Sequence, residues 1–156
     1  MGLSRGALDE LIGLKLRLTQ LHFFAVYYAE FGPLGITPAE YAILELVAEN
    51  PGTRQGVLAE ALSIKRSNMT KVVRGLEDRG LLRRAVPIDD ARAVELSLTA
   101  AGEALRQQLA ASMRRNDRLA ASALDAGEQA ELLRLLDKLL AAGAGRELTG
   151  MELSDG

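Results

Sequence analysis

The stretch from Leu58 to Thr99 constrains the fold of this chain more than any other. Its first part predicts a short apolar helix that ends at Leu62 and is followed by a tight turn at residues 63–64. A longer basic and amphipathic helix is expected from Lys65 to Arg79, and Gly80 is the residue type that most often follows the end of a helix. The stretch therefore begins as two helices joined by a turn.

Two further segments alternate between apolar and polar residues, as strands do. They run from Leu81 to Ala85 and from Ala93 to Leu98, and the polar turn Pro87–Asp90 lies between them. The expected order is therefore helix, turn, helix and β-hairpin. Aromatic residues make up only 4% of the chain, and its many Leu and Ala residues favour helices elsewhere. The predicted fold class is mainly α with a small β-hairpin.

The helix expected from Lys65 to Arg79 has two different faces. One face is apolar at helical spacing and is predicted to lie inside, with Met69, Val72, Val73 and Leu76. The other face points towards solvent or a partner, and it carries Arg66, Asn68, Thr70, Lys71 and Arg74.

The net charge of −2 conceals an uneven distribution of charged residues. Between Arg54 and Arg92, nine basic residues stand against five acidic ones, a local charge of +4 that leaves −6 on the rest of the chain. Phosphates respond to the local field rather than to the net charge of a protein. A basic module on an acidic body therefore predicts a protein that binds DNA.

Helices are also expected before this module. The first runs from about Ala7 to Phe31, and its last residues, FFAVYYAEF, are apolar on nearly every side. A capping box of Thr37 and Glu40 begins a second helix, which stops at Asn50-Pro51-Gly52. Thr53 is then expected to cap the helix that ends at Leu62.

Two more helices are expected after the hairpin. Thr99 caps the first of these, with Glu103 close to the capping-box position, and this helix extends to about Leu124. Asp125 begins the last helix, which is apolar at Leu132, Leu135, Leu136, Leu139 and Leu140. The Gly-rich tail from Gly143 onward is expected to be frayed.

The long terminal helices have little core to cover in a single subunit of 156 residues. Packing them against the same helices of a second copy gives a two-fold homodimer. Two DNA-reading helices about one turn of DNA apart match a palindromic operator. The expected organisation is an N-terminal dimerisation helix (1–36), a DNA-binding module (37–98), C-terminal dimerisation helices (99–142) and a flexible tail (143–156).

Over almost its whole length the chain resembles the MarR family of winged helix-turn-helix transcriptional regulators. The resemblance is sharpest in the run LSIKRSNMTKVVRGLEDRGLLRR, in Asp90-Ala91-Arg92 and in Leu96–Thr99. In the family pattern a Leu-x-x-x-Gly step ends the recognition helix, here Leu76 to Gly80. A wing with Asp-x-Arg and then a Leu-Thr pair that opens a dimerisation helix follow. The resemblance implies a mainly α fold with a two-stranded β wing and N- and C-terminal dimerisation helices.

The resemblance also implies that the basic helix enters the major groove and that the wing tip reaches the neighbouring minor groove. Arg pairs well with guanine and Asn with adenine, so Asn68 and Arg74 are expected at base edges. Arg92 is expected in the minor groove, with Asp90 holding the wing or orienting this arginine. Further contacts, mainly to phosphates, are expected from Arg54, Lys65, Arg66, Ser67, Thr70, Lys71 and Arg84.

The sequence departs from the family pattern at one position. Many members have Ser or Thr just before the recognition helix as its cap, and this chain has Lys65 there. Two alternatives follow: Ser63 caps the helix, or Lys65 meets a phosphate.

Members of the family commonly bind small aromatic acids or phenolic compounds between the dimer helices and the DNA-binding module. Candidate residues for such a site, which would take an aromatic acid or its thioester, are Arg17, His22, Phe23, Tyr27 and Tyr41. Aromatic residues at helical spacing are more often core or dimer contacts. Two hypotheses therefore stay open, a repressor released by an aromatic ligand and a regulator without an effector.

The sequence lacks the residues and motifs that several classes of function require. The chain has no cysteine and one histidine, which argues against disulfides, thiolate metal sites and zinc sites. It has no nucleophile elbow, P-loop, dinucleotide fingerprint or zinc-protease motif, so we expect neither an enzyme nor a cofactor. No signal peptide or membrane span is recognised, which predicts a soluble, cytoplasmic protein. A winged helix that binds another protein instead of DNA is the remaining alternative.

Overall fold

The computed structural model describes residues 5–86 and 94–143, and the chain divides into two compact units. The first unit, Met1–Ala120, contains the helix-turn-helix, a small sheet and two long helices. The second unit, Ala121–Gly156, contains α6 (Ala126–Gly143). Within the described residues, no helix combines the length and the apolar character needed to cross a membrane.

The N-terminal segment is broken where one continuous helix was predicted. A 3-10 helix, η1 (Gly6–Glu10), precedes α1 (Ile12–Phe31), and Leu11 between them has an extended backbone (φ −81°, ψ 114°). An extended residue interrupts the i to i−4 hydrogen-bond ladder, so the prediction of one helix from Ala7 was wrong at this point. A short 3-10 turn, η2 (Gly32–Leu34), follows α1.

The helix α2 (Pro38–Glu49) begins as predicted. The Glu40 backbone N–H donates to Thr37 Oγ1 (3.2 Å), and the Thr37 N–H donates to Glu40 Oε2 (2.8 Å). Each side chain thus satisfies a backbone donor that the first turn of a helix leaves free. The expected capping box is confirmed.

A short strand lies where Thr53 was expected to cap a helix. The strand β1 (Thr53–Arg54) pairs with β3 (Glu95–Leu98), and Thr53 lies opposite Leu96. The helix α3 (Gln55–Ala61) follows with Arg54 as its N-cap and without a side-chain cap. The backbone of Thr53 is thus part of the sheet, and the predicted cap was wrong.

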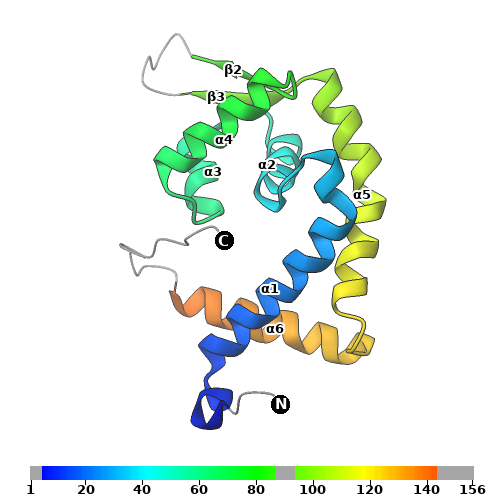
Figure 1. Ribbon diagram of the computed structural model, residues 1–156. Coiled ribbons are helices and arrows are strands. Elements are labelled where there is room, and N and C mark those ends of the chain that lie inside the picture. The colour runs from blue at the N-terminus through cyan, green and yellow to red at the C-terminus, as the bar shows by residue number, and fades with distance from the viewer. Residues whose placement is uncertain (1–4, 87–93, 144–156) are drawn as a thin grey trace. The chain divides into compact units, whose positions relative to one another are not determined.

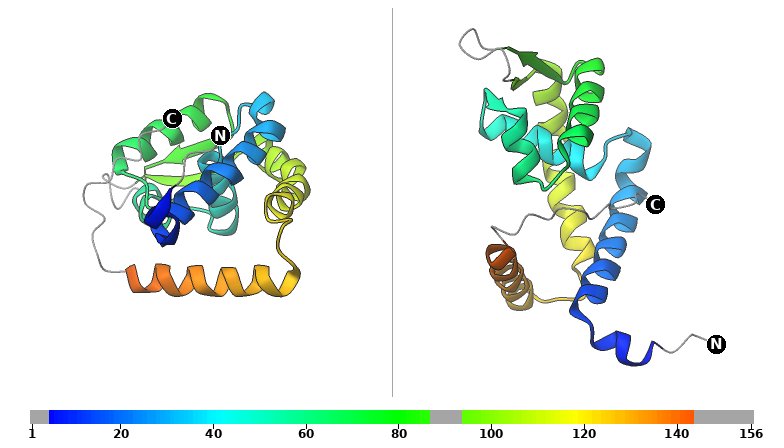
Figure 2. Two further views of the ribbon diagram at one scale, coloured as in Figure 1. Left: turned by 60° about the horizontal axis from the view of Figure 1, so that its bottom comes forward. Right: turned by 90° about the vertical axis from the view of Figure 1, so that its left-hand side faces the viewer.

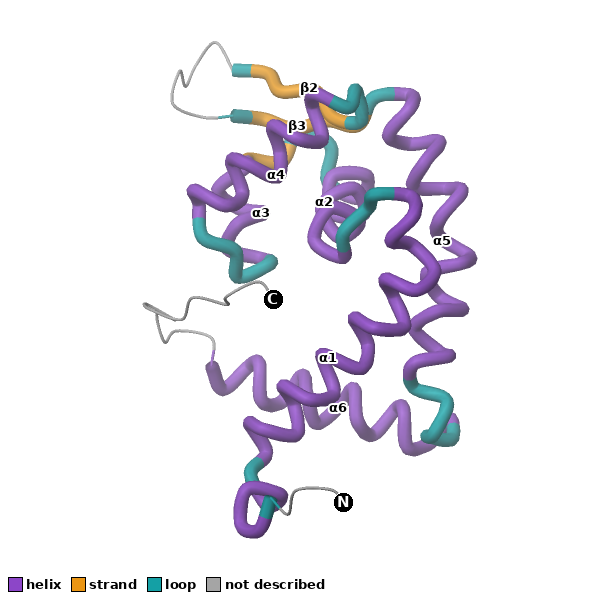
Figure 3. The backbone as a smooth tube through the Cα atoms, viewed as in Figure 1, coloured by secondary structure: helices purple, strands orange, loops and turns teal. Residues whose placement is uncertain are grey.

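The central part of the predicted order is confirmed. The helix α4 (Arg66–Asp78) and the antiparallel strands β2 (Leu82–Ala85) and β3 follow α3. The sheet has the order β1-β3-β2, so β1 adds a third strand to the predicted wing. Figure 3 shows β2 and β3 beside α4, and the contacts with α4 are made by β2.

The helix α5 (Ala100–Ala120) starts at the predicted cap but ends earlier than expected. The Gly102 N–H donates to Thr99 Oγ1 (3.0 Å), whereas Glu103 accepts hydrogen bonds from Arg106 instead of completing a capping box. Residues 121–124 form a turn, and a reciprocal Asp125–Glu128 pair then caps α6. Figure 2 shows α1 and α5 side by side in the first unit.

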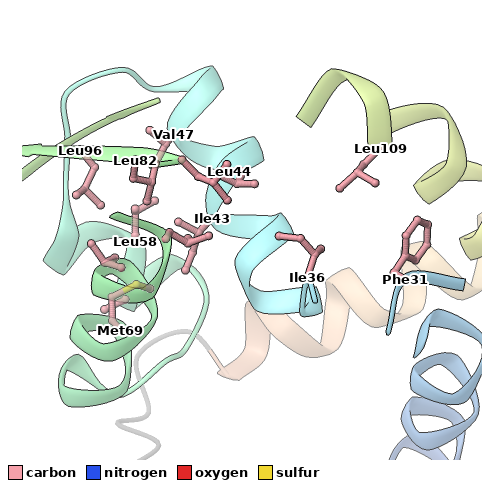
Figure 4. Close-up of a cluster of buried hydrophobic side chains, with 14 of the residues drawn as sticks. Phe31, Ile36, Ile43, Leu44, Val47, Leu58, Met69, Leu82, Leu96 and Leu109 are labelled. Carbon is pink, nitrogen blue, oxygen red and sulfur yellow. The ribbon is translucent and has the colours of Figure 1, made fainter. Parts of the chain in front are cut away.

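One apolar core holds the first unit together. Figure 4 shows side chains from α2, α3, α4 and the sheet pointing towards one another, and Phe31 and Leu109 extend the core to α1 and α5. Burial of one such side chain contributes about 1.5–3 kcal/mol. Three residues on one face of α4 are fully buried, namely Met69, Val73 and Leu76. The core therefore determines which face of α4 points outward.

Candidate DNA-binding surface

The outward face of α4 carries a stripe of polar residues. Ser67, Lys71 and Arg74 are exposed and follow one another at helical spacing, opposite the buried face of the helix. Among the described residues, none of the three makes a side-chain hydrogen bond or an ion pair with another part of the chain. Their polar groups are therefore available to an external partner. Figure 1 shows α4 beside the strands of the hairpin.

The other predicted residues of α4 lie beside this stripe. Asn68 is exposed at one edge of it. Arg66 and Thr70 lie on the opposite flank, where Arg66 Nη2 is 3.6 Å from Glu60 Oε1 of α3. Thr70 Oγ1 donates to the Arg66 carbonyl (3.0 Å) and accepts from Gln55 Nε2 (2.9 Å). The Thr70 hydroxyl is thus engaged inside the fold.

Basic residues also stand at the N-terminal ends of both helices of the helix-turn-helix. Arg54 and Lys65 are exposed N-cap residues of α3 and α4. No side chain caps α4, and Ser63 lies in the preceding turn with a left-handed backbone (φ 51°), so the alternative that Ser63 caps this helix was wrong. A cleft of about 510 Å³ between α3 and α4 is lined by residues that include Arg54, Arg66, Thr70 and Val94.

The two arginines of β2 differ in their surroundings. Arg84 Nε donates to Glu77 Oε2 of α4 at 2.6 Å, and both side chains are about one-third exposed. Arg83 is exposed, and no acidic partner is found for it in the described part of the chain. Residues 87–93, and with them the predicted wing contacts Asp90 and Arg92, lie outside the described residues.

Arg79 at the end of α4 is held by the segment that precedes and begins α2. Its Nη1 donates to the Gly35 carbonyl (3.0 Å) and to Glu40 Oε1 (3.3 Å). Among the described cations of α4 and β2, Lys71, Arg74 and Arg83 therefore keep their charge without an acidic partner. The positive field of this surface is concentrated on the outward stripe of α4 and the outer side of β2.

Three of the residues predicted to bind a ligand use their polar atoms within the fold. Tyr27 is buried and donates to the Ile36 carbonyl (3.1 Å), and burial raises the pKa of its hydroxyl well above the usual value. His22 Nε2 lies 3.0 Å from the Ala120 carbonyl at the end of α5. Tyr41 donates to Glu45 Oε1 (2.5 Å).

Burial and the hydrogen bond to Glu45 raise the pKa of Tyr41 to about 12. Phe23 is half-buried and makes an edge-to-face contact with the His22 ring, and Arg17 is exposed. A hollow of about 630 Å³ on α1 and α5 is lined by Ala25, Val26, Ala29, Glu30, Asn116 and Leu119. None of the predicted ligand residues lines it. Among the described residues, no group of three or more His, Asp or Glu side chains could hold a metal ion.

Sequence reasoning missed Gln55 and Glu77, which hold the flank of α4. Neither belongs to a sequence pattern that signals a contact. Gln55 lies 15 residues from its partner Thr70, and Glu77 is separated from Arg84 by the Gly80 turn. Only the folded chain brings these pairs together.

In comparisons with known proteins, the chain is similar to transcriptional repressors and to the MarR family. The family model described as "MarR family" matches residues 34–93. An HTH-type transcriptional repressor of Mycobacterium tuberculosis is 34% identical over 111 residues, which cover 71% of this chain and 80% of the relative. The homoprotocatechuate degradative operon repressor of Escherichia coli is 28% identical over 138 residues, with 86% and 92% covered.

Two solved structures have the same fold. The transcriptional repressor CouR, bound to a 23-mer DNA duplex, matches with a TM-score of 0.81 and 32% identity, over 90% of this chain and 99% of CouR. The PcaV transcriptional regulator of Streptomyces coelicolor, in complex with its natural ligand, matches with a TM-score of 0.77 and 28% identity, over 92% and 99% of the two chains.

Proposed function

Because this chain belongs to the MarR family and is a transcriptional repressor of that type rather than an enzyme, we propose that it binds a palindromic operator as a homodimer. We further propose that a small aromatic acid, or its thioester, releases it from DNA. The protein then acts in the cytoplasm, where the DNA of its bacterial relatives lies.

The exposed stripe of α4 is the observation that carries the DNA-binding part of the proposal. Lys71 and Arg74 present cations without an acidic partner in the described chain, on a helix whose opposite face is locked into the core. Arg74 and Asn68 read base edges in the major groove, and Ser67 and Lys71 hold phosphates. Arg54, Lys65 and Arg66 add phosphate contacts, and Arg92, supported by Asp90, enters the minor groove.

A homodimer is supported by the apolar surface that each unit leaves exposed. In the first unit Leu8, Ile12 and Leu21 are 53%, 68% and 48% exposed, and in the second Leu133 and Leu140 are 64% and 73% exposed. Contiguous exposed apolar surface commonly marks an interaction site. Residues 1–36 and 99–142 thus form the dimerisation part, and residues 37–98 form the DNA-binding module.

Response to an aromatic ligand is supported by two relatives. One represses an operon that degrades homoprotocatechuate, an aromatic acid, and another is solved with its natural ligand. In this chain Phe24 and Tyr28 of α1 form an exposed edge-to-face pair, with 6.3 Å between ring centroids. This pair offers aromatic surface beside Tyr27 and His22, whose polar atoms lie at backbone carbonyls. A ligand releases DNA only if it prefers the conformation that cannot bind DNA.

The DNA-binding proposal is tested with a duplex selected by the wild-type protein from a pool with a random core. Arg74→Ala and Arg92→Ala should each weaken binding of this duplex by about 1–3 kcal/mol at physiological salt. Arg118→Ala, at an exposed arginine of α5, serves as the control and should leave the affinity unchanged. Unchanged binding by both test variants would contradict the proposed surface.

Light scattering measures the homodimer directly, and a monomer at micromolar concentration would contradict it. Thermal-shift screening with aromatic acids and their thioesters tests the effector. A true effector should raise Tm and weaken binding of the selected duplex. If no compound does both, the alternative of a regulator without an aromatic effector stands.

A further inference from the structure

We propose that two side-chain hydrogen bonds, Glu77–Arg84 and Thr70–Gln55, set the orientation of the hairpin strands relative to α4. They are called the two ties below. On this view Arg84 and Thr70 are positioning residues for operator recognition and do not themselves contact DNA. The inference rests on the proposed function, since it concerns how the same surface reads its operator.

The first tie joins the last turn of α4 to strand β2. Arg84 Nε donates to Glu77 Oε2 at 2.6 Å, and the two side chains are 32% and 33% exposed. In the sheet Arg84 lies opposite Leu96, which is fully buried, and Arg84 shares its side of β2 with buried Leu82. Arg84 therefore points towards α4, whereas Arg83 points to the other side of the strand.

The second tie joins the middle of α4 to strand β3 through Gln55. The Gln55 backbone N–H donates to the Val94 carbonyl next to β3 (3.0 Å), and its Nε2 donates to Thr70 Oγ1 (2.9 Å). Thr70 Oγ1 in turn donates its own hydrogen to the Arg66 carbonyl (3.0 Å). The hydroxyl hydrogen of Thr70 is thus already used.

Both ties lie on the same flank of α4. Thr70 and Glu77 are seven residues apart, about two helical turns, so their side chains share one side of the helix. The ties reach the two paired strands of the hairpin separately, Glu77 through β2 and Thr70 through β3. The core decides which face of α4 points outward, and two points of attachment on one flank then limit small rotations of α4 about its axis relative to the hairpin. Such rotations would turn the stripe with Lys71 and Arg74.

The negative charge of Glu77 leads to two opposite expectations for the variant Glu77→Gln. A glutamate in the last turn of a helix meets the negative end of the helix dipole, and at the rim of a DNA-binding surface it repels phosphates. Electrostatics alone therefore predicts that Glu77→Gln binds DNA more tightly. The tie predicts the opposite for a specific duplex, because Arg84 loses its charged anchor.

The test compares the selected duplex with a duplex of unrelated sequence, using the wild type, Glu77→Gln, Arg84→Gln and the double variant. The double variant leaves the summed charge of the pair unchanged. We expect Glu77→Gln and the double variant each to weaken binding of the selected duplex about tenfold, because contacting residues couple on this scale. Binding of the unrelated duplex by the double variant, and its salt dependence, should stay unchanged.

Two results would overturn the first tie. One is equal or tighter binding of the selected duplex by Glu77→Gln. The other is an equal loss on both duplexes for Arg84→Gln, with a salt slope lower by about one, which is the signature of a direct phosphate contact. Arg83→Gln, on the neighbouring arginine, is the matched control for loss of one charge from β2.

Thr70 provides a separate measurement for the second tie. Thr70→Val removes the hydroxyl at nearly the same shape and should weaken only the selected duplex, whereas Thr70→Ser keeps the hydroxyl and should restore binding. Equal affinity of Thr70→Val and the wild type would overturn this tie. If Arg74→Ala loses binding while the tie variants do not, the inference fails and the proposed function stands. If the wild type selects no duplex, both fail.

Discussion

Gly102 lies where the first turn of α5 meets the backbone that follows α4. A Cβ at this position would be 2.0 Å from the Leu81 carbonyl oxygen and 3.0 Å from its carbonyl carbon. Thr99 holds the same backbone, because its N–H donates to the Leu81 carbonyl (3.1 Å) and its hydroxyl donates to the Gly80 carbonyl (2.5 Å). We predict that Gly102→Ala forces α5 away from this turn.

The size of the effect follows from these contacts. Ordinary contact begins at 3.4 Å, so the alanine methyl and the Leu81 carbonyl must separate by more than an ångström, which breaks both Thr99 hydrogen bonds. Each bond contributes about 1 kcal/mol, overpacking costs about 1–3 kcal/mol, and the better helix propensity of Ala returns about 0.5–1 kcal/mol. Together these contributions give a loss of about 2–4.5 kcal/mol, so we expect the free energy of unfolding to fall by about 3 kcal/mol, or roughly 6–12 °C in Tm.

Urea unfolding followed by circular dichroism measures this loss, at one protein concentration because association changes apparent stability. Gly75→Ala is the matched control, since the same substitution in the middle of α4 meets no atom within 4 Å. It should stabilise the protein by about 0.5–1 kcal/mol. If Gly102→Ala is as stable as Gly75→Ala, the close approach does not constrain the fold and the reasoning is refuted.

Three further substitutions test other parts of the first unit. Hydrogen bonds from Arg106 lower the pKa of Glu103 to about 2. The Glu103 carboxylate therefore stabilises the fold at pH values above its unfolded pKa of about 4.3. This contribution is lost as the pH falls towards 2. Glu103→Gln should therefore flatten the pH dependence of Tm between pH 4.5 and 2, and an unchanged profile would contradict this. Asn116 is buried and donates to Glu30 Oε2 (2.9 Å), so Asn116→Asp replaces this donor with a second carboxylate and should lower Tm. An unchanged Tm would contradict a role for this hydrogen bond. Thr37→Ala removes the cap of α2 and should cost about 1 kcal/mol in urea unfolding, while Thr37→Ser should cost little.

Sequence reasoning succeeded where the signal is local. The capping box at Thr37, the cap at Thr99 and the buried side of α4 depend on residues within about one turn of each other, and the structure confirms them. It failed where a local pattern competes with a distant partner. Thr53 has the residue type of a helix cap, but its backbone pairs with β3, which lies far along the chain.

The binding surface shows the same division. Residue types and charge predicted which part of the chain would face DNA, but they could not distinguish the cations without an acidic partner from those in ion pairs. Arg79 reaches Glu40 and Arg84 reaches Glu77 only after folding. The predicted ligand residues Tyr27 and His22 are likewise engaged by backbone carbonyls that the sequence does not place near them.

By itself the sequence determined the elements of the helix-turn-helix, the amphipathic face of α4 and the concentration of positive charge around it. These properties depend on residue types and short spacings, which the chain carries before it folds. The tertiary structure decided how α4 is oriented and which of its polar groups remain available. Those properties depend on contacts such as Thr70 with Gln55 and Gly102 with Leu81. Such contacts form only when packing of the common core brings distant segments within hydrogen-bonding distance.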